Sequence, residues 1–420
     1  MNSESGDGRI PIVYVTARYP PMASSGTYRV EAVQRFLPDH GFEVTVVTIP
    51  PSWVRQQSGV TSLQVGSGPP VVQPTAPSDR FLQTAAAIPG LRWVLREALI
   101  PDLLTPWARY VGRRLELGVV APSMVYATGP PFGALVAAQG MADRLGIPLI
   151  LEVRDPPSFN RRLRTRSRFT RWRMLQFERK YLGKADAVIT VTRGTRRRLL
   201  ELHPPLDPGR IFVVTNGYPE TDVDPRLSGR DWSKFTVAYV GSFQGGEAKG
   251  STFTPEILIP ALRQLPADQT RLRIVGPITA SQRARLGDAG NDLIEVVGPV
   301  LRTQALAEMA AADMVLVLAE DDPWWIGRKV FEAMAYSSRI LAVVPPGDAA
   351  DLLAQSEQAH LVHLDELHRL PEVVSATFRE WQDGIKPLPP RVRGLQTDKS
   401  CVAQIAEVLN FALGDSGVDR

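Results

Sequence analysis

Cysteine is nearly absent from this sequence: Cys401 is the only one among 420 residues. A single cysteine excludes an internal disulfide and any metal site built from several cysteines. Its neighbours, "SCVAQIAEV", have the spacing of one helix face, so we expect Cys401 to pack in a core. Metal-ligand spacing is also missing around the five histidines, which we expect at the surface. They are His40, His203, His360, His363 and His368.

Long hydrophobic runs are missing as well. No stretch of about 18 or more uncharged apolar residues, the length that spans a bilayer, occurs in the chain. The N-terminal segment "MNSESGDGRI" lacks the basic region and apolar run of a secretory signal. These absences favour a cytoplasmic protein. The formal net charge of +4 is too small to indicate nucleic acid as a partner, but it would suit an anionic substrate or membrane surface.

Two sets of short, β-branched apolar runs alternate with helical segments, a pattern typical of parallel sheets covered by helices. The first set is "IPIVYVTA" (10–17), "EVTVVTI" (43–49), "MVYAT" (124–128), "PLILEV" (148–153), "AVITVT" (187–192) and "IFVVTN" (211–216). The second set is "FTVAYVG" (235–241), "LRIVG" (272–276), "IEVVG" (294–298), "MVLVLA" (314–319) and "RILAVV" (339–344).

This pattern predicts an α/β protein with two Rossmann-like, doubly wound parallel-sheet domains. A chain of 420 residues also exceeds the roughly 250 to 300 residues that one hydrophobic core supports. We assign the first domain to residues 1–217, a Pro- and Asp-rich linker to 218–234, the second domain to 235–397 and a final helical segment to 398–420. Ligands of such sheets bind beyond the carboxyl ends of the strands, so site residues are expected there.

Small residues follow the first strand of each set. Ser24, Ser25 and Gly26 precede a predicted helix, and free N–H groups at a helix start attract anions; an ordinary turn is the alternative. The second set opens with "VGSFQGGEAKGS", in which Lys249 can reach a phosphate; a solvated lysine in a flexible loop is the alternative. The P-loop motif does not fit, because Gly250 follows Lys249.

A cation and a carboxylate lie near the start of the helix in "GRKVFEAMAY". Phe331 and Met334 have the spacing of core residues, whereas Lys329 and Glu332 lie three apart on another face. A carboxylate can accept hydrogen bonds from both hydroxyls of a ribose, and a lysine near a helix start can help to hold a diphosphate. A surface salt bridge between the two residues is the alternative.

In this order and spacing, the motifs resemble those of the retaining GT-B glycosyltransferases of family 4, especially bacterial members that build capsule, O-antigen or natural-product sugars. The resemblance covers most of the chain. It rests on the loop ending at Gly26, "MVYATGPPFGALVAAQGMADRLGIPLILEVRDPP", "ADAVITVT", "IFVVTNGYPETDVDP", "VAYVGSFQGGEAKGS", "LRIVG", "VVGPV" and "KVFEAMAYSSRILAVVPPGDAADLL".

The resemblance implies a GT-B fold, with two domains that face each other across a cleft and a C-terminal helix that crosses back to the first. The implied activity is transfer of a sugar from a nucleoside diphosphate, such as a UDP-, GDP- or dTDP-sugar, to a glycan, lipid-linked or secondary-metabolite acceptor. Glu332 matches the residue that binds the donor ribose, Lys249 the lysine that meets the diphosphate, and Lys329 the lysine of the K-[LV]-[FY]-E variant. The remaining donor-binding positions are Gly26, Gly241, Ser242, Val300, whose backbone matches the nucleobase site, and Val330.

Two positions depart from the family pattern. Trp324 stands where many members carry a glutamate, eight positions before Glu332, and Ser242 stands where many carry an arginine. The tryptophan puts the identity of the donor sugar in doubt. These departures motivate an alternative function, a non-catalytic partner protein that binds a nucleotide sugar. A GT-B sugar-nucleotide epimerase is a further alternative, although the acid and base residues it needs are not evident.

The implied chemistry needs neither a metal nor another cofactor. Breakage of the donor bond adds negative charge to the diphosphate, and Lys249 and Lys329 are placed to stabilise that charge. The segment Asp222-Val223-Asp224 has the D-x-D pattern that binds metals in other transferases. It lies in the predicted linker rather than after a buried strand, so we do not expect a metal there.

Two segments of the first domain are candidates for acceptor binding. Arg154 and Asp155 follow a buried strand, and Asp155 could orient the acceptor hydroxyl; a turn aspartate before proline is the alternative. The segment 161–173 is rich in arginine and includes Phe169 and Trp172, which suits phosphates or peripheral contact with the inner, anionic face of a membrane. A solvated helix face is the alternative for that segment.

Overall fold

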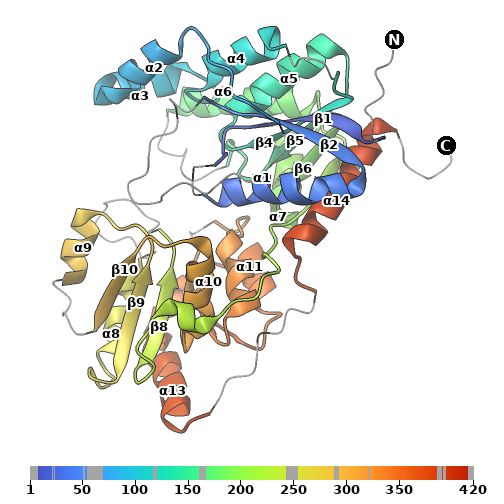
Figure 1. The fold of residues 1–420 in the computed structure, drawn as a ribbon. Helices are drawn as coiled ribbons and strands as arrows, with labels where there is room; N and C mark the ends of the chain where they lie inside the picture. Colours follow the sequence, from blue (N-terminus) through green and yellow to red (C-terminus); the bar gives the residue numbers. More distant parts are fainter. Residues whose placement is uncertain are drawn as a thin grey trace. The chain divides into compact units, whose positions relative to one another are not determined.

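The computed structural model describes residues 8–20, 22, 24–50, 53, 70–116, 121–159, 167–242, 254–287, 293–319, 322–385, 390 and 394–414. Lys249 and residues 161–166 of the arginine-rich segment lie outside these ranges. The chain divides into two compact units, Met1–Thr215 with Asp398–Arg420, and Asn216–Thr397. Each unit contains one sheet covered by helices (Figure 1). The segment 218–234, predicted as a linker, lies in the second unit, and the final helix lies in the first.

The first unit is built on a seven-stranded sheet with the order β3-β2-β1-β4-β5-β6-β7. All neighbouring strands pair in parallel. The predicted parallel sheet is therefore confirmed, and one short edge strand, β3, was missed. The strands are β1 (Ile10–Thr16), β2 (Phe42–Val47), β3 (Val71–Val72), β4 (Met124–Gly129), β5 (Leu149–Val153), β6 (Ala187–Thr190) and β7 (Ile211–Val213).

Helices cover both faces of this sheet. Serine and threonine hydroxyls fix several helix starts; Ser24, for example, accepts a hydrogen bond from the Thr27 N–H at 3.2 Å. The helices α1 and α14 pack on one face, and α4 and α5 pack on the other. The helices are α1 (Ser25–Phe36), α2 (Asp79–Ala87), α3 (Pro89–Ala98), α4 (Thr105–Arg114), α5 (Gly133–Leu145), α6 (Arg168–Leu182), α7 (Arg193–Leu202) and α14 (Asp398–Leu413).

The C-terminal helix α14 contributes to the core of the first unit, although it follows the second unit in the sequence. Its residues Cys401, Ile405 and Leu409 are at most 1% exposed and pack in one cluster with Val30 of α1 and Tyr126 of β4. The prediction that Cys401 packs in a core is confirmed. Residues that are distant in sequence thus share one hydrophobic core.

Because Ile405 is fully buried in the first unit, Ile405→Val is expected to destabilise that unit by about 0.5–1.5 kcal/mol. Urea unfolding followed by tryptophan fluorescence would measure the change. Ile385→Val is the matched control, since Ile385 belongs to the second unit and is exposed. Equal small effects of the two substitutions would show that α14 contributes little to the core.

The second unit contains a six-stranded sheet with the order β10-β9-β8-β11-β12-β13. All neighbouring strands are parallel. The five strands predicted for this unit are present, and the edge strand β13 was missed. The strands are β8 (Phe235–Val240), β9 (Thr270–Val275), β10 (Ile294–Gly298), β11 (Met314–Leu318), β12 (Ile340–Val343) and β13 (Ala359–Val362).

The helices of the second unit also form two layers. Residues of α10, α11 and α12 pack on one face of the sheet, and residues of α8, α9 and α13 pack on the other. The helices are α8 (Ile259–Leu262), α9 (Ala280–Gly287), α10 (Arg302–Ala311), α11 (Arg328–Tyr336), α12 (Asp348–Leu353) and α13 (Leu370–Gln382). Among the helices in the described ranges, none combines the length and apolar character needed to cross a bilayer.

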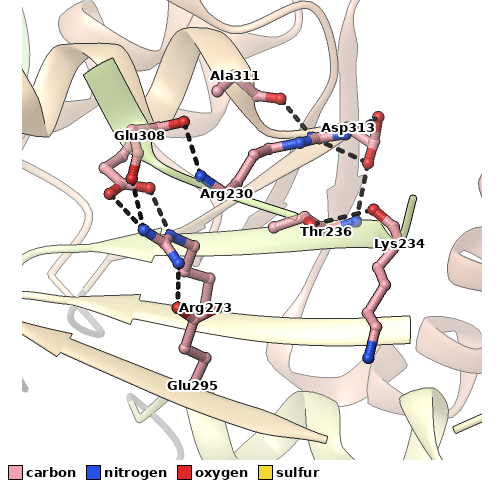
Figure 2. A network of polar contacts seen from close by, with 9 residues as sticks. Arg230, Lys234, Thr236, Arg273, Glu295, Glu308, Ala311 and Asp313 are labelled. Atoms are coloured by element: carbon pink, nitrogen blue, oxygen red, sulfur yellow. Dashed lines mark hydrogen bonds and ion pairs between the residues drawn. The ribbon is translucent and has the colours of Figure 1, made fainter. Parts of the chain in front are cut away.

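A network of buried ion pairs holds α10 on the second sheet (Figure 2). The Arg273 guanidinium of β9 donates from Nε to Glu308 Oε2 of α10 at 2.7 Å and from Nη2 to Oε1 at 3.0 Å. It also pairs with Glu295 of β10 and donates to the carbonyl of Ser228 at 2.6 Å. Loss of one partner would leave the other charge buried without compensation, which lowers the stability of the fold strongly. The network therefore fixes the orientation of α10 on the sheet.

One sequence-based prediction about the histidines is wrong. His203, expected at the surface, is only 3% exposed. Its Nε2 lies 2.8 Å from Glu178 Oε2 of α6. The other oxygen of Glu178 accepts a hydrogen bond from the Ser158 N–H at 2.7 Å. A carboxylate from a neighbouring helix therefore satisfies the polar ring and allows its burial, which the local sequence around His203 does not reveal.

Candidate functional site

The second sheet has a topological switch point between β8 and β11. In the strand order, β9 and β10 lie on one side of this point, next to β8. The strands β11, β12 and β13 lie on the other side, and α11 follows β11 in the chain. In doubly wound sheets, ligands bind in the crevice outside the carboxyl ends of the strands at this point. The residues that follow β8 and β11 are therefore the candidate site in this unit, and they include Gly241, Ser242, Lys329 and Glu332.

Glycines let the strand ends approach one another closely at this edge. Gly241 has φ of 156° and Gly276, after β9, has φ of 140°. A Cβ atom at Gly276 would collide with the Gly241 carbonyl, so a larger residue does not fit there. A Cβ atom at Gly241 would lie 3.0 Å from Cε of Lys329. The stem of Lys329 therefore lies directly against the end of β8.

Glu332 is a deeply buried charged group of the site. Its side chain is 6% exposed. Oε1 accepts hydrogen bonds from Nη2 of Arg302 at 3.1 Å and Nε of Arg328 at 3.2 Å. Oε2 lies 3.9 Å from Nζ of Lys329. Two guanidiniums thus hold one carboxylate oxygen, while the other faces the half-exposed lysine and has capacity to accept further hydrogen bonds.

The surrounding charges keep the Glu332 carboxylate ionised. Burial by itself raises the pKa of Glu332, but Lys329, Arg328 and Arg302 outweigh that effect, so the pKa lies below its ordinary value. The pKa of Lys329 is also lowered, first by loss of water around the ammonium and then by repulsion from the two arginines, against the attraction of Glu332. Since 47% of the Lys329 side chain is exposed, water still supports its charged form. The cluster therefore carries a net positive charge.

The stability contribution of Glu332 is expected to depend on pH. A glutamate whose folded pKa is depressed stabilises the fold above its unfolded pKa of about 4.3 and loses this effect as the pH falls through the folded pKa. The difference in urea midpoint between wild type and Glu332→Gln should be constant from about pH 7 to pH 5 and shrink toward about pH 3. A difference that widens on acidification would contradict the depressed pKa.

The start of α11 is shaped by the segment before it. Gly327 is the N-cap residue, and no side chain caps the helix there. A Cβ atom at Gly327 would collide with the Trp325 ring, so glycine allows the tryptophan to pack over the first turn. The backbone N–H of Trp324, at the position of the family's glutamate, donates to Asp322 Oδ1 at 3.1 Å. The preceding loop thus places the Trp325 ring beside this helix start.

The structure brings most predicted donor-site residues of the second unit to one edge and adds two that sequence reasoning missed. Arg328 could have been found, because it lies four residues before Glu332 in the same helix. Arg302 could not, because it reaches Glu332 from α10, 30 residues away. Val330 is buried at 1% exposure and belongs to the core, so only its backbone can take part. The Ser242 carbonyl accepts a hydrogen bond from the Tyr239 hydroxyl at 2.8 Å.

The first unit has a comparable edge at its own switch point, between β1 and β4. Gly26, near the N-terminus of α1, lies so close to Arg154 that an added Cβ would be 2.9 Å from Nη2. Arg154 follows β5 and donates from Nη2 to the Pro130 carbonyl at 3.2 Å. Asp155 is half-buried beside it. A helix N-terminus and a guanidinium therefore meet at this edge, an arrangement that favours an anionic group.

A buried charge network lies beneath this edge. Nε of Arg29 in α1 donates to Glu152 Oε1 in β5 at 2.9 Å, and the Tyr126 hydroxyl donates to Oε2 at 3.0 Å. The guanidinium of Arg29 also donates to the Thr215 carbonyl at 2.9 Å. Burial raises the pKa of Glu152, but Arg29 and Arg154 more than reverse this, so the pKa is lowered. The network fixes α1 on the sheet and so positions Gly26.

The D-x-D segment has a local structural role. Asp224 is the N-cap of a 3-10 helix, Pro225–Ser228, and accepts a hydrogen bond from the Arg226 N–H at 3.0 Å. Its carboxylate also pairs with the Arg226 guanidinium at 2.9 Å. Within the described ranges, no group of three or more His, Cys, Asp or Glu side chains is arranged to hold a metal ion.

Comparison with known proteins shows which family the first unit resembles. Residues 26–217 match the glycosyl transferase 4-like domain. This domain makes up most of the first unit, which is therefore similar to GT4-like glycosyltransferases. An alpha-maltose-1-phosphate synthase of Mycolicibacterium smegmatis is 27% identical over 248 residues, which cover 54% of this chain and 62% of that protein's length.

Solved structures show that the chain has the GT-B fold. Sucrose-phosphate synthase from Thermosynechococcus elongatus superposes with a TM-score of 0.64 at 17% identity, over 97% of this chain and 100% of that one. HepE of Anabaena, in complex with UDP and glucose, gives a TM-score of 0.61 at 15% identity, over 96% and 99% of the two chains. The predicted fold class and family resemblance are both confirmed.

Proposed function

We propose that this protein is a retaining, metal-independent glycosyltransferase that uses a nucleoside-diphosphate sugar, with UDP-sugars as the first candidates. The observation that carries this proposal is Glu332, a buried carboxylate kept ionised at the switch point of the second sheet by three cations. HepE, which shares the fold, was solved with UDP and glucose, and this supports the choice of nucleotide.

In the proposed donor complex, Oε2 of Glu332 accepts hydrogen bonds from the ribose hydroxyls. Oε1 is already occupied by Arg302 and Arg328, so these arginines act as positioning residues for the carboxylate. The backbone near Val300 contacts the base. Lys329, at the start of α11, and Lys249, from the loop after β8, face the diphosphate together with the N-terminus of the helix. Three positive groups would then act on one dianionic leaving group.

The reaction breaks the bond between the anomeric carbon and the β-phosphate oxygen and forms a bond from that carbon to the acceptor hydroxyl oxygen. The acceptor proton passes to the departing phosphate oxygen, and the configuration at the anomeric carbon is retained. The cations stabilise charge that develops on the diphosphate as the bond breaks, so their effect is largest in the transition state. No metal ion is required in this proposal.

The first unit would bind the acceptor. Asp155 would orient the acceptor hydroxyl, and Arg154, beside the N-terminus of α1, would hold an anionic group. The acceptor hydroxyl belongs to a glycan, a lipid-linked sugar or a small metabolite. This assignment rests on the position of both residues at the carboxyl edge of the first sheet.

A donor-turnover assay tests the proposal. The full-length protein is incubated with a panel of UDP-, GDP- and dTDP-sugars, with and without a mixture of simple acceptors, and release of nucleoside diphosphate is measured. We expect release with at least one UDP-sugar and no loss of rate in excess EDTA. Calorimetry with UDP runs in parallel. Tight UDP binding without turnover of any donor would instead support the non-catalytic, nucleotide-sugar-binding alternative.

A further inference from the structure

We propose that the first unit docks on an anionic lipid bilayer through an aromatic–arginine surface formed by α2, α3 and the first turns of α6. Seven of the thirteen large hydrophobic side chains that are exposed in the described ranges lie on these three helices or between them. The surface is defined by Phe81, Ile88, Leu91, Trp93, Val94, Phe169 and Trp172, together with Arg92, Arg96, Arg168 and Arg171.

The exposed side chains of this surface are large and mostly aromatic. Phe81 is 71% exposed, Trp93 65%, Phe169 64% and Trp172 54%. Phe169 and Trp172 stack with ring centroids 5.8 Å apart. Scattered exposed apolar residues need no explanation, but a group of this size on adjacent helices marks an interaction surface.

Helix α3 presents an apolar stripe to solvent rather than to the core. Leu91 and Val94 lie three apart and are both exposed, and Leu95, next on the same stripe, is only half-buried. None of these residues belongs to a core cluster of the described chain. Amphipathic helices normally bury this stripe. The arrangement in α3 is the one expected of a helix whose apolar face meets an external apolar phase.

Polar contacts join α3 and α6 into one surface. The Glu97 carboxylate of α3 accepts hydrogen bonds from the hydroxyl of Ser167, at 2.9 Å, and from that of Thr170 at the start of α6. Arg173 of α6 donates to the carbonyls of Glu97 and Ala98, both at 3.1 Å. These contacts fix the two helices against each other. Figure 1 shows α2 and α3 next to each other at one end of the first unit.

The charge of the surface indicates which partner it fits. Arg92, Arg96, Arg168 and Arg171 are exposed, whereas the acidic side chain of α3, Glu97, is engaged by α6. Arginine and tryptophan together are typical of segments that lie in the headgroup region of an anionic bilayer. Most protein partners would need matching carboxylates for each arginine, whereas a layer of anionic headgroups satisfies all of them at once. We therefore favour the bilayer over a protein.

The docking surface also bears on the acceptor, and this step rests on the proposed function. Helix α6 follows the segment that carries Arg154 and Asp155, and Glu178 of α6 accepts a hydrogen bond from the Ser158 N–H at 2.7 Å. Contact of α6 with a bilayer would bring the proposed acceptor-binding residues near its surface. The matching acceptor is a lipid-linked sugar rather than a free metabolite.

Vesicle flotation with the full-length protein tests the docking. Vesicles of phosphatidylcholine alone are compared with vesicles that contain phosphatidylglycerol, at low and at physiological salt. We expect binding to the anionic vesicles only. Trp93→Ser and Trp172→Ser should each weaken the partition coefficient roughly tenfold. The pair Arg92→Gln and Arg171→Gln should weaken it about fivefold per arginine at low salt.

Two matched controls separate docking from general stickiness. Trp232→Ser removes a tryptophan of similar exposure, 55%, from the second unit, and Arg193→Gln removes an exposed arginine from α7; both should leave partitioning unchanged. Absence of binding to anionic vesicles, or equal losses in Trp93→Ser and Trp232→Ser, would overturn the proposal. So would a dimer in sedimentation analysis that Trp93→Ser disrupts, since a second copy would then cover the surface.

The same variants keep this inference distinct from the proposed function. Donor hydrolysis and UDP affinity, measured without vesicles, should be unchanged in Trp93→Ser and Trp172→Ser. If vesicle binding fails while donor turnover is present, the docking surface is wrong and the glycosyltransferase proposal stands. If the protein binds vesicles but turns over no donor, the docking surface stands and the glycosyltransferase proposal is wrong.

Discussion

Glu332→Gln is expected to lower kcat/KM for the donor sugar roughly 10- to 150-fold, with most of the loss in KM. The substitution keeps the size and shape of the side chain. It replaces a charged acceptor of ribose hydrogen bonds with a neutral one, and a charge-assisted hydrogen bond contributes about 1.5–3 kcal/mol. The ribose does not change during the reaction, so ground state and transition state lose the same interaction, and kcat is affected less than KM.

The surroundings of Glu332 add a second reason for this loss. With glutamine in place, Arg302, Arg328 and Lys329 remain close together without the carboxylate that separates their charges. Repulsion among them is expected to displace the Arg302 side chain and the start of α11, and so to disturb the position of the ribose. Steady-state kinetics and UDP calorimetry measure both effects.

A matched control exists on the surface of the same unit. Glu366 and Arg369 form an i,i+3 ion pair at 3.0 Å, with both side chains more than one-third exposed. Glu366→Gln should leave kcat, KM and UDP affinity unchanged, because such pairs contribute little. If Glu332→Gln behaves like Glu366→Gln, then Glu332 is only a structural ion-pair partner and the ribose is bound elsewhere.

The core of each sheet could be predicted because its signal is local. Eleven apolar runs predicted as strands correspond to β1, β2 and β4 to β12, and most of their residues are buried. The two missed strands, β3 and β13, lie at sheet edges and have only two and four residues. An edge strand is half covered and needs no continuous apolar run, so its sequence resembles that of a loop.

The candidate site could be predicted only in part. The positions of Gly241, Lys329 and Glu332 follow from the rule that sites lie after parallel strands. The role of Arg302 depends on how α10 packs, which Arg273 and Glu308 fix through a buried ion pair. Such contacts between distant elements have no local sequence signal. The burial of His203 was mispredicted for the same reason, since Glu178 reaches it from another helix.

The exposed surface of α2 and α3 was also beyond sequence reasoning. Phe81, Trp93 and Val94 have the composition of core residues, and a sequence pattern does not show whether an apolar stripe meets a core or an external phase. Only the structure shows these side chains exposed. The arginine-rich segment 161–173 did signal anionic partners, and the structure joins its described end to α3 through Ser167 and Glu97.

Lys329→Met is expected to lower kcat about 10²- to 10³-fold, with a much smaller change in KM, the opposite split from Glu332→Gln. Methionine preserves the apolar stem that packs on Gly241 and removes the ammonium. The diphosphate gains charge as the glycosidic bond breaks, so the lost interaction is strongest in the transition state. Rapid-quench or steady-state kinetics with a UDP-sugar would measure the loss in kcat, and calorimetry the smaller loss in UDP affinity.

Lys184→Met is the matched control for this prediction. Lys184 is 51% exposed, close to the 47% of Lys329, and lies 3.3 Å from Asp143 in the first unit. The two lysines therefore have similar exposure and a similar acidic neighbour, but only Lys329 stands at a helix start beyond the carboxyl edge of a sheet. Equal kinetics for the two variants would mean that Lys329 only offsets the charge of Glu332, and that leaving-group stabilisation depends on other cations of the site, first of all Arg302.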